Sequence, residues 1–420
     1  MSIWRVNGGK KLQGACFVQG AKNAALPVMA ASVLCPARTE LFNVPRIADV
    51  ENTLRILRCL GCEARQEGTD VYIDSGGLRS FSIPREMMEG MRSSVIFLGA
   101  LLARCGEARI SMPGGCNLGA RPIDLHLAAL EAMGAEISVR DGEIYCRTDG
   151  LHGAEIALPL PSVGATENAM LAACAAKGET VIQGAAREPE IEDLQEYLRR
   201  LGAGIYGAGT GRIIVSGASG FTPEARAGHR IMPDRIACAT ILCAAAASGG
   251  DVELVGVEPK HFSTVTDLLE RAGCAIITKS RSSRIISDGP LHSPGAVFTG
   301  PYPGFPTDAQ PLLMAALLKA EGTTEFTENI FENRFRHVSA FRSFGADAEA
   351  EGARAVVRGV AALHGAEVVS TDLRAGAAMV IAGLSAEGET HILDEGHIVR
   401  GYDGLDRTLC ALGGDVALTA

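Results

Sequence analysis

Six stretches of the chain are apolar around nearly the whole circumference of a helix. They are residues 22–34, 92–104, 166–177, 234–248, 308–320 and 372–386. A helix that is apolar on every side is normally buried, so the pattern predicts six interior helices. Five of them run into a glycine, near positions 106, 178, 250, 322 and 388, and short segments with β-branched residues follow.

A second helix recurs between these, and each copy ends with Leu or Phe four residues before a Gly. The six glycines are Gly61, Gly134, Gly202, Gly273, Gly345 and Gly413, and successive ones lie 73, 68, 71, 72 and 68 residues apart. Glycine often ends a helix because it adopts the left-handed conformation without strain. We therefore expect each Gly to close a helix before a strand, in six repeats of about 70 residues that fill the chain.

A unit of this size cannot cover a buried helix alone, so neighbouring units must share a core. Three units around three helices give one closed α/β domain, and six give two domains, the number that 420 residues also favour. An open solenoid is the alternative. Solenoids normally have atypical terminal repeats, whereas these six resemble one another, so we favour two domains.

Composition narrows the class of partner. The net charge of −10 argues against nucleic acid as the main partner, because neutralising phosphates needs a basic face. The longest weakly polar run, residues 236–248, is too short to span a bilayer. The 12 cysteines are scattered along the chain, which favours reduced thiols over a disulfide framework. We expect a cytoplasmic protein whose partners are neither nucleic acid nor membrane.

The starts of the interior helices carry polar and charged residues. They are Lys22, Asn23, Arg92, Thr166, Glu167, Asp234, Arg235, Asp308, Asp372 and Arg374. Thr166, Asp234 and Asp372 are expected to be simple helix caps. Lys and Arg oppose the dipole at a helix N-terminus, and a bound phosphate would relieve that conflict. Asp308 is open to two interpretations, a cap or a general base.

Cys116 lies in a segment typical of a loop. Residues 113–124 read Pro-Gly-Gly-Cys-Asn-Leu-Gly-Ala-Arg-Pro-Ile-Asp, and so many glycines and prolines exclude a regular helix or central strand. The nearby Arg121 would favour the thiolate or tune proton exchange. Cysteines in apolar runs are expected to be inert, and Cys59 and Cys62 lack the second pair of a metal site.

Seven motifs together resemble a known family. They are residues 21–24 (Ala-Lys-Asn-Ala), 113–116 (Pro-Gly-Gly-Cys), 119–124 (Gly-Ala-Arg-Pro-Ile-Asp), 162–167 (Ser-Val-Gly-Ala-Thr-Glu), 186–193 (Ala-Arg-Glu-Pro-Glu-Ile-Glu-Asp), 305–308 (Phe-Pro-Thr-Asp) and 331–334 (Phe-Glu-Asn-Arg). Over essentially its whole length the chain resembles the UDP-N-acetylglucosamine 1-carboxyvinyltransferases. These enolpyruvyl transferases open peptidoglycan precursor synthesis.

The resemblance implies a fold and a division into domains. The family fold is a two-domain inside-out α/β barrel with three repeats in each domain, which agrees with the repeat count. One domain would be residues 22–229 and carry the Cys116 loop. The other would combine residues 1–21 with 230–420 and carry Asp308 and Arg400. The resemblance also implies that the domains close on the sugar nucleotide.

The resemblance further implies a reaction without metal or organic cofactor. Phosphoenolpyruvate would be joined to the 3′-hydroxyl of UDP-N-acetylglucosamine, with release of phosphate. Cys116 would protonate the methylene carbon, and Asp308 would accept the proton of the sugar hydroxyl. The implied substrate-binding residues are Lys22, Arg92, Arg121 and Arg400 for phosphoenolpyruvate, Asn23 for the sugar, Arg121, Pro122, Ile123, Asp124, Leu125, Ser162, Val163 and Gly164 for the uridine diphosphate, and Ile330, Arg334 and Asp372 beside them.

Three positions depart from the family pattern: Asn117 beside the cysteine, Pro161 near the expected diphosphate site, and Ala237 in the helix after Pro233. Two alternative functions remain. A shikimate-type enolpyruvyl transferase has the same fold but no use for a cysteine loop. A non-catalytic paralogue that binds sugar nucleotide would have no need to keep Cys116, Asp308, Lys22 and Arg121 together.

Overall fold

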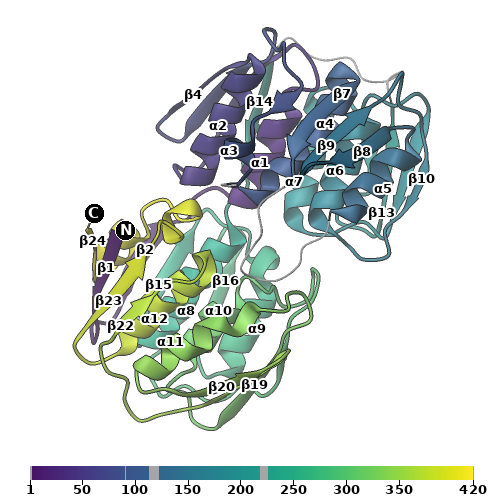
Figure 1. Ribbon diagram of the computed structural model, residues 1–420. Coiled ribbons are helices and arrows are strands. Elements are labelled where there is room, and N and C mark those ends of the chain that lie inside the picture. Colours follow the sequence, from purple (N-terminus) through teal and green to yellow (C-terminus); the bar gives the residue numbers. More distant parts are fainter. Residues whose placement is uncertain (1, 90, 113–122, 218–225, 420) are drawn as a thin grey trace. The chain divides into compact units, whose positions relative to one another are not determined.

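The computed structural model describes residues 2–89, 91–112, 123–217 and 226–419. These residues form two compact units, each with its own hydrophobic core. The N-terminal unit lies between Gly20 and Met232. The C-terminal unit is formed by the chain up to Gln19 together with the chain from Pro233 onward. Each unit has three sheets and three interior helices (Figure 1).

The sheets of the N-terminal unit have four strands each. In spatial order they are β14 (Arg226–Arg230), β3 (Arg38–Phe42), β5 (Asp70–Asp74) and β4 (Glu63–Glu67); β6 (Ser82–Ile83), β7 (Glu107–Ser111), β9 (Glu143–Arg147) and β8 (Glu136–Arg140); and β10 (Glu155–Ala157), β11 (Glu179–Gln183), β13 (Arg212–Ser216) and β12 (Gly204–Tyr206).

The C-terminal unit repeats this arrangement. Its sheets are β16 (Ala275–Lys279), β17 (Ser282–Ile286), β15 (Asp251–Val255) and β2 (Gln13–Phe17); β18 (Val297–Phe298), β19 (Thr323–Thr327), β21 (Arg354–Arg358) and β20 (Asp347–Glu351); and β22 (Glu367–Val369), β23 (Glu389–Asp394), β1 (Ser2–Asn7) and β24 (Asp415–Thr419). Every one of the six sheets combines one parallel pair with two antiparallel pairs.

The interior helices are α1 (Lys22–Ala31), α4 (Phe97–Cys105), α6 (Val163–Ala173), α8 (Arg235–Ser248), α10 (Gln310–Ala316) and α12 (Leu373–Ser385). In the C-terminal unit α8, α10 and α12 contact one another pairwise (Figure 1). Every residue of α8 up to Ala246 is buried, because small and apolar side chains allow neighbours on all sides. The predicted interior helices and the inside-out α/β fold are confirmed.

Amphipathic helices form the outer set: α2 (Ala48–Leu60), α5 (Asp124–Ala132), α7 (Pro189–Arg200), α9 (Ser263–Arg271), α11 (Val338–Ser343) and α13 (Leu405–Ala411). Short helices complete the described chain: α3 (Arg85–Glu89) and the 3-10 turns η1 (Arg92–Ile96), η2 (Pro259–Phe262), η3 (Arg334–His337) and η4 (Ile398–Arg400). Within the described ranges, none of the helices combines the length and apolar character needed to cross a membrane.

The glycines that end the outer helices behave as predicted. The φ angles are 102° at Gly61, 91° at Gly134, 95° at Gly202, 105° at Gly273, 85° at Gly345 and 93° at Gly413. The left-handed region explains the choice of glycine at all six positions. At the end of α8, Gly249 rather than Gly250 is the left-handed cap, with φ of 69°.

Three predicted helix starts were wrong, and one of them is that of α10, which begins at Gln310 rather than at Asp308. The stretch that begins at Arg92 opens as the 3-10 turn η1 and becomes α-helical only at Phe97. Helix α6 begins at Val163, and the side chain of Ser162 caps it by accepting from the Ala165 amide at 3.4 Å. Thr166 is therefore inside the helix, where its hydroxyl donates to the Ser162 carbonyl and accepts from the Ala186 amide.

Candidate active site

Asp308 lies between two arginines in the C-terminal unit. Its Oδ1 is 3.2 Å from Nη2 of Arg334, and its Oδ2 is 3.0 Å from Nη2 of Arg374. The Asp308 side chain is 29% exposed, whereas those of Arg334 and Arg374 are 1% and 4% exposed. The carboxylate therefore reaches the surface while the cations that hold it do not.

This geometry excludes one of the two interpretations of Asp308. Helix α10 begins at Gln310, and no side chain caps its first turn. The Asp308 carboxylate instead ends in ion pairs with side chains of distant segments. Asp308 is therefore not a helix cap, which leaves its predicted role as a general base.

Arg334 is held by main-chain and side-chain acceptors. Its Nε and Nη2 donate to the Thr307 carbonyl at 3.1 and 3.0 Å, and its Nη1 is 3.6 Å from Asp372. The segment before it is fixed by Glu328, whose carboxylate accepts from the Ile330 and Phe331 amides and from the Thr307 hydroxyl. The predicted residues Asp308, Arg334 and Asp372 therefore come together, with the exposed Ile330 on the adjoining segment.

The structure gives the helix-start residues of this unit partners within the chain. Asp234 and Asp372 cap α8 and α12 through backbone amides, as predicted. Arg374, in the first turn of α12, has Asp308 as its counter-ion. Arg235 lies over the ring of Tyr302, at 5.6 Å from the centroid. The conflict between cation and helix dipole is thus relieved at α12 by a carboxylate of the protein itself.

The sequence marks Arg374 only as a cation at a helix start and not as a partner of Asp308. Burial disfavours its charged form, but the nearby Tyr402, Asp308 and Asp234 outweigh that effect and raise the pKa of Arg374. Sequence spacing offers no sign of this contact, because Asp308 and Arg374 are 66 residues apart. The predicted ligand Arg400 ends the 3-10 turn η4 and is half-buried.

In the N-terminal unit Lys22 and Arg92 lie at the starts of two interior segments. Lys22 opens α1 and pairs with Asp49 through Nζ at 3.1 Å. Its neighbour Asn23 is exposed, and Arg92 opens η1. Arg92 is close enough to His126 to contribute to lowering the pKa of that imidazole.

His126, in the first turn of α5, is a buried titratable group. Asn168 donates from Nδ2 to His126 Nδ1 at 2.7 Å and to the Val95 carbonyl at 3.1 Å, while its Oδ1 accepts from the Gly99 amide at 2.7 Å. Because Nδ1 is an acceptor here, the neutral ring carries its proton on Nε2. Burial, with a smaller effect of Arg92, lowers the pKa of His126 to about 4.

The His126 ring lies against the predicted uridine diphosphate segment. A Cβ atom added to Gly164 would be 2.8 Å from its Cε1. Val163 and Gly164 open α6 after the cap Ser162, and Asp124 and Leu125 open α5 after Ile123. The structure thus brings residues 162–164 against the ring of His126, which directly follows the other predicted segment, residues 123–125.

Three predicted site residues, Cys116, Arg121 and Pro122, lie outside the described residues, as does Asn117. Burial raises the pKa of several other thiols, to about 11 for Cys35 and Cys62 and to about 12 for Cys146 and Cys174, as expected for structural cysteines. Among the described residues, His, Cys, Asp and Glu form no group that could hold a metal ion.

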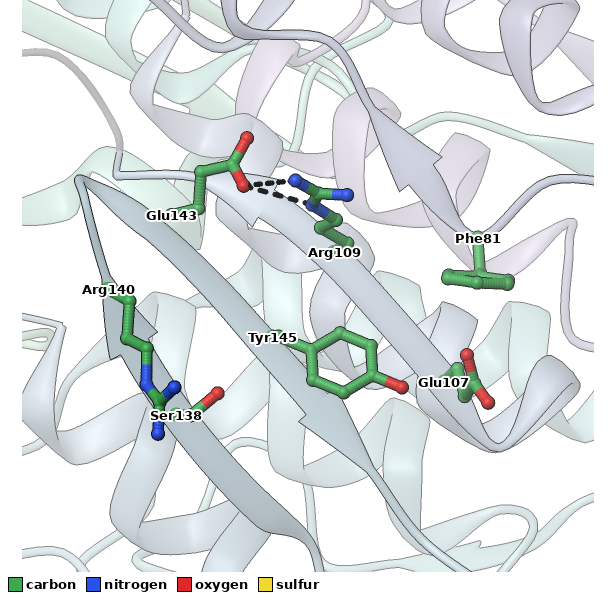
Figure 2. A pocket seen from close by; sticks show the side chains of 7 residues that line it. All are labelled: Phe81, Glu107, Arg109, Ser138, Arg140, Glu143 and Tyr145. Carbon is green, nitrogen blue, oxygen red and sulfur yellow. Dashed lines mark hydrogen bonds and ion pairs between the residues drawn. The ribbon is translucent and has the colours of Figure 1, made fainter.

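A shallow hollow of about 330 Å³ lies over the sheet of β6 to β9. Its lining residues are Phe81, Glu107, Arg109, Ser138, Arg140, Glu143 and Tyr145 (Figure 2). Arg109 donates from Nε to Glu143 at 3.0 Å, so a carboxylate already compensates its charge. None of the predicted substrate ligands lies in this hollow, and we assign it no role.

Comparison with known proteins places the chain in a family. A sequence profile described as EPSP synthase (3-phosphoshikimate 1-carboxyvinyltransferase) matches residues 6–409. A relative from Geotalea uraniireducens, named UDP-N-acetylglucosamine 1-carboxyvinyltransferase, is 45% identical over 98% of both chains. One from Mesorhizobium japonicum, named UDP-N-acetylglucosamine 1-carboxyvinyltransferase 2, is 46% identical over 99% of both.

Solved structures share the fold. The enolpyruvyl transferase NikO from Streptomyces tendae aligns with a TM-score of 0.89 and 24% identity over 100% of this chain and 99% of that one. EPSP synthase from Acinetobacter baumannii aligns with a TM-score of 0.74 and 20% identity over 100% of both chains. The chain therefore belongs to the EPSP synthase family of enolpyruvyl transferases and, within it, to the UDP-N-acetylglucosamine 1-carboxyvinyltransferases.

Proposed function

We propose that the protein transfers the enolpyruvyl group of phosphoenolpyruvate to the 3′-hydroxyl of UDP-N-acetylglucosamine and releases phosphate. The observation that carries this proposal is the surface-reaching carboxylate of Asp308, fixed at both oxygens by buried arginines. The relatives named for this activity support it over the shikimate-type alternative, because they are 44–46% identical across nearly the whole chain.

The chemistry requires one acid and one base. Asp308 accepts the proton of the 3′-hydroxyl of the sugar, and the oxygen of that hydroxyl forms a bond to the central carbon of phosphoenolpyruvate. Cys116 gives a proton to the methylene carbon, which becomes a methyl group. The resulting tetrahedral phospho-lactoyl species then loses a methyl proton and inorganic phosphate, and the double bond returns. Holding both groups in place supplies much of the rate enhancement in such a reaction.

The remaining site residues are assigned by their match to the family motifs. Lys22, Arg92, Arg121 and Arg400 bind the phosphate and carboxylate of phosphoenolpyruvate, since developing negative charge needs cations fixed beforehand. Asn23, Ile330, Arg334 and Asp372 serve the sugar and the segment around Asp308. Residues 121–125 and 162–164 hold the uridine diphosphate.

The domain division that we propose is residues 22–229 for one domain and residues 1–21 with 230–420 for the other. We place the enzyme in the cytoplasm. The 11 described cysteines are free thiols, as is usual in a reducing compartment.

The test is phosphate release from phosphoenolpyruvate in the presence of UDP-N-acetylglucosamine or of shikimate 3-phosphate. We expect phosphate release when the acceptor is UDP-N-acetylglucosamine and none when it is shikimate 3-phosphate. Release only with shikimate 3-phosphate would refute the proposal. Tight binding of UDP-N-acetylglucosamine without turnover on either acceptor would instead favour a non-catalytic paralogue.

A further inference from the structure

The contacts that hold the Asp308 carboxylate include two residues to which no role has been assigned so far. We propose that Arg374 and Tyr402 are positioning residues, which set the orientation of the Asp308 carboxylate without touching substrate. The inference rests on the proposed function, in which Asp308 is the proton acceptor.

The first step is the pair of contacts between Arg374 and the Asp308 carboxylate. Its Nε and Nη2 both contact Oδ2 of Asp308, at 3.1 and 3.0 Å, while Arg334 contacts Oδ1 at 3.2 Å. With one arginine on each oxygen, the carboxylate cannot rotate about its Cβ–Cγ bond. Arg334 alone would restrain that rotation through a single contact at 3.2 Å, whereas Arg374 adds two more on the other oxygen.

The second step is that Arg374 is itself buried and held by neighbouring residues. It is buried in the first turn of α12, where the Asp372 cap accepts its backbone amide at 2.9 Å. Its guanidinium lies over the ring of Tyr402, at 5.4 Å from the centroid. The ring against its face and the carboxylate at its Nε and Nη2 edge therefore leave the guanidinium little freedom to follow a displaced carboxylate.

The third step is that Tyr402 is anchored to a different interior helix. Its hydroxyl is 2.8 Å from Oγ1 of Thr240 in α8. The Thr240 hydroxyl already donates its one proton to the Ile236 carbonyl, so Tyr402 must donate in this bond. These contacts thus join α8, α12 and the segment before α10. Tyr402 also follows the predicted ligand Arg400 by two residues.

Stability alone is a poor explanation for this arrangement. A buried ion pair must overcome the cost of taking both charges out of water, and apolar side chains of similar volume are often as stable. The ion pair does fix the orientation of the Asp308 carboxylate. Reactions that depend on alignment can lose about 100-fold in rate when a group moves by about 1 Å.

The test compares Arg374→Lys and Tyr402→Phe with Tyr197→Phe. Tyr197 is the matched control, because it is a fully buried tyrosine in the other unit, whose hydroxyl is likewise 2.8 Å from a threonine, Thr39. The measurements are kcat, KM for each substrate and the thermal midpoint. Arg374→Gln is a further variant that removes the cation.

We expect kcat to fall roughly 100-fold in Arg374→Lys, further in Arg374→Gln, and roughly 5-fold in Tyr402→Phe, with both KM values within about 3-fold of wild type. Tyr197→Phe should lose as much thermal stability as Tyr402→Phe but keep its kcat. Should Arg374→Gln fail to fold, Tyr402→Phe and Arg374→Lys still decide the question.

Three results would overturn the inference. An unchanged kcat in Arg374→Lys and Tyr402→Phe would show that these two residues do not position the Asp308 carboxylate for the reaction. A selective rise in KM for phosphoenolpyruvate would make Arg374 a substrate ligand instead. Wild-type protein that releases no phosphate with UDP-N-acetylglucosamine would refute the proposed function, and this inference with it.

Discussion

Asn168 offers a sharp test of how the N-terminal unit holds its predicted nucleotide segments. Its side chain is fully buried and joins three elements, by bonds to Gly99 in α4, to Val95 in η1 and to His126 in α5. The Gly99 amide lies in the first turn of α4, where helix geometry leaves amides without a partner. Asn168→Ala would remove all three bonds at once.

The size of the effect follows from what is left behind. A buried polar group without a partner costs about 1–3 kcal/mol, and three groups would lose theirs. Water entering the space would satisfy part of them, so we expect a loss of about 3–5 kcal/mol in the free energy of unfolding. That is a large share of the total of about 5–15 kcal/mol for a typical domain.

The matched control is Asn52→Ala in the same unit. The Asn52 amide is half-buried and makes one bond, to the Met87 carbonyl at 3.0 Å. Water replaces such a bond easily, so this variant should lose less than about 1 kcal/mol.

The assay is urea unfolding of both variants, followed by circular dichroism and by the fluorescence of Trp4. Trp4 is the one tryptophan of the chain and lies in the core of the C-terminal unit, so its signal separates the two units. We expect a lower midpoint at an unchanged slope for the N-terminal unit of Asn168→Ala. A shift no larger than that of Asn52→Ala would refute the reasoning.

Three further predictions follow from the same contacts. Gly164→Ala should weaken UDP-N-acetylglucosamine binding about 10-fold by calorimetry, because the new methyl group meets the fixed ring of His126; unchanged affinity would place the uridine diphosphate elsewhere. The pKa of His126 falls from 6.5 in the unfolded chain to about 4, so its contribution to stability is complete above pH 6.5 and is lost, by roughly 3 kcal/mol, as the pH falls to 4. His126→Gln should flatten that part of the stability profile, and an equally steep profile would exclude His126 as its source. Cys116→Ala should abolish turnover in the phosphate assay while Cys116→Asp keeps a measurable rate, since a carboxylic acid can also give the proton; full activity of the alanine variant would exclude Cys116 as the acid.

Features with a local cause could be predicted from the sequence. The six glycines from Gly61 to Gly413 end helices because left-handed backbone favours glycine, and a local conformational preference of this kind leaves a repeated pattern. Asp234 and Asp372 cap helices through amides two and three residues away, which is also a local effect. The prediction that Thr166 caps a helix was wrong because Ser162, one turn earlier, is the cap of α6.

Features that depend on distant contacts could not be predicted. The ion pair between Asp308 and Arg374 joins residues 66 positions apart, and the bond between His126 and Asn168 joins residues 42 apart. A lone arginine or histidine in the sequence does not show which carboxylate or amide it will meet. The motifs mark the predicted segments of the site, and only the folded chain shows which side chains hold them.

The central claim concerns the bond that the enzyme makes. Purified protein incubated with phosphoenolpyruvate and UDP-N-acetylglucosamine should give a product whose NMR spectrum shows two vinyl protons and an ether link to C3′ of the sugar, and Asp308→Asn should form it far more slowly. A product joined at another hydroxyl, or an Asp308→Asn variant as fast as wild type, would contradict the account.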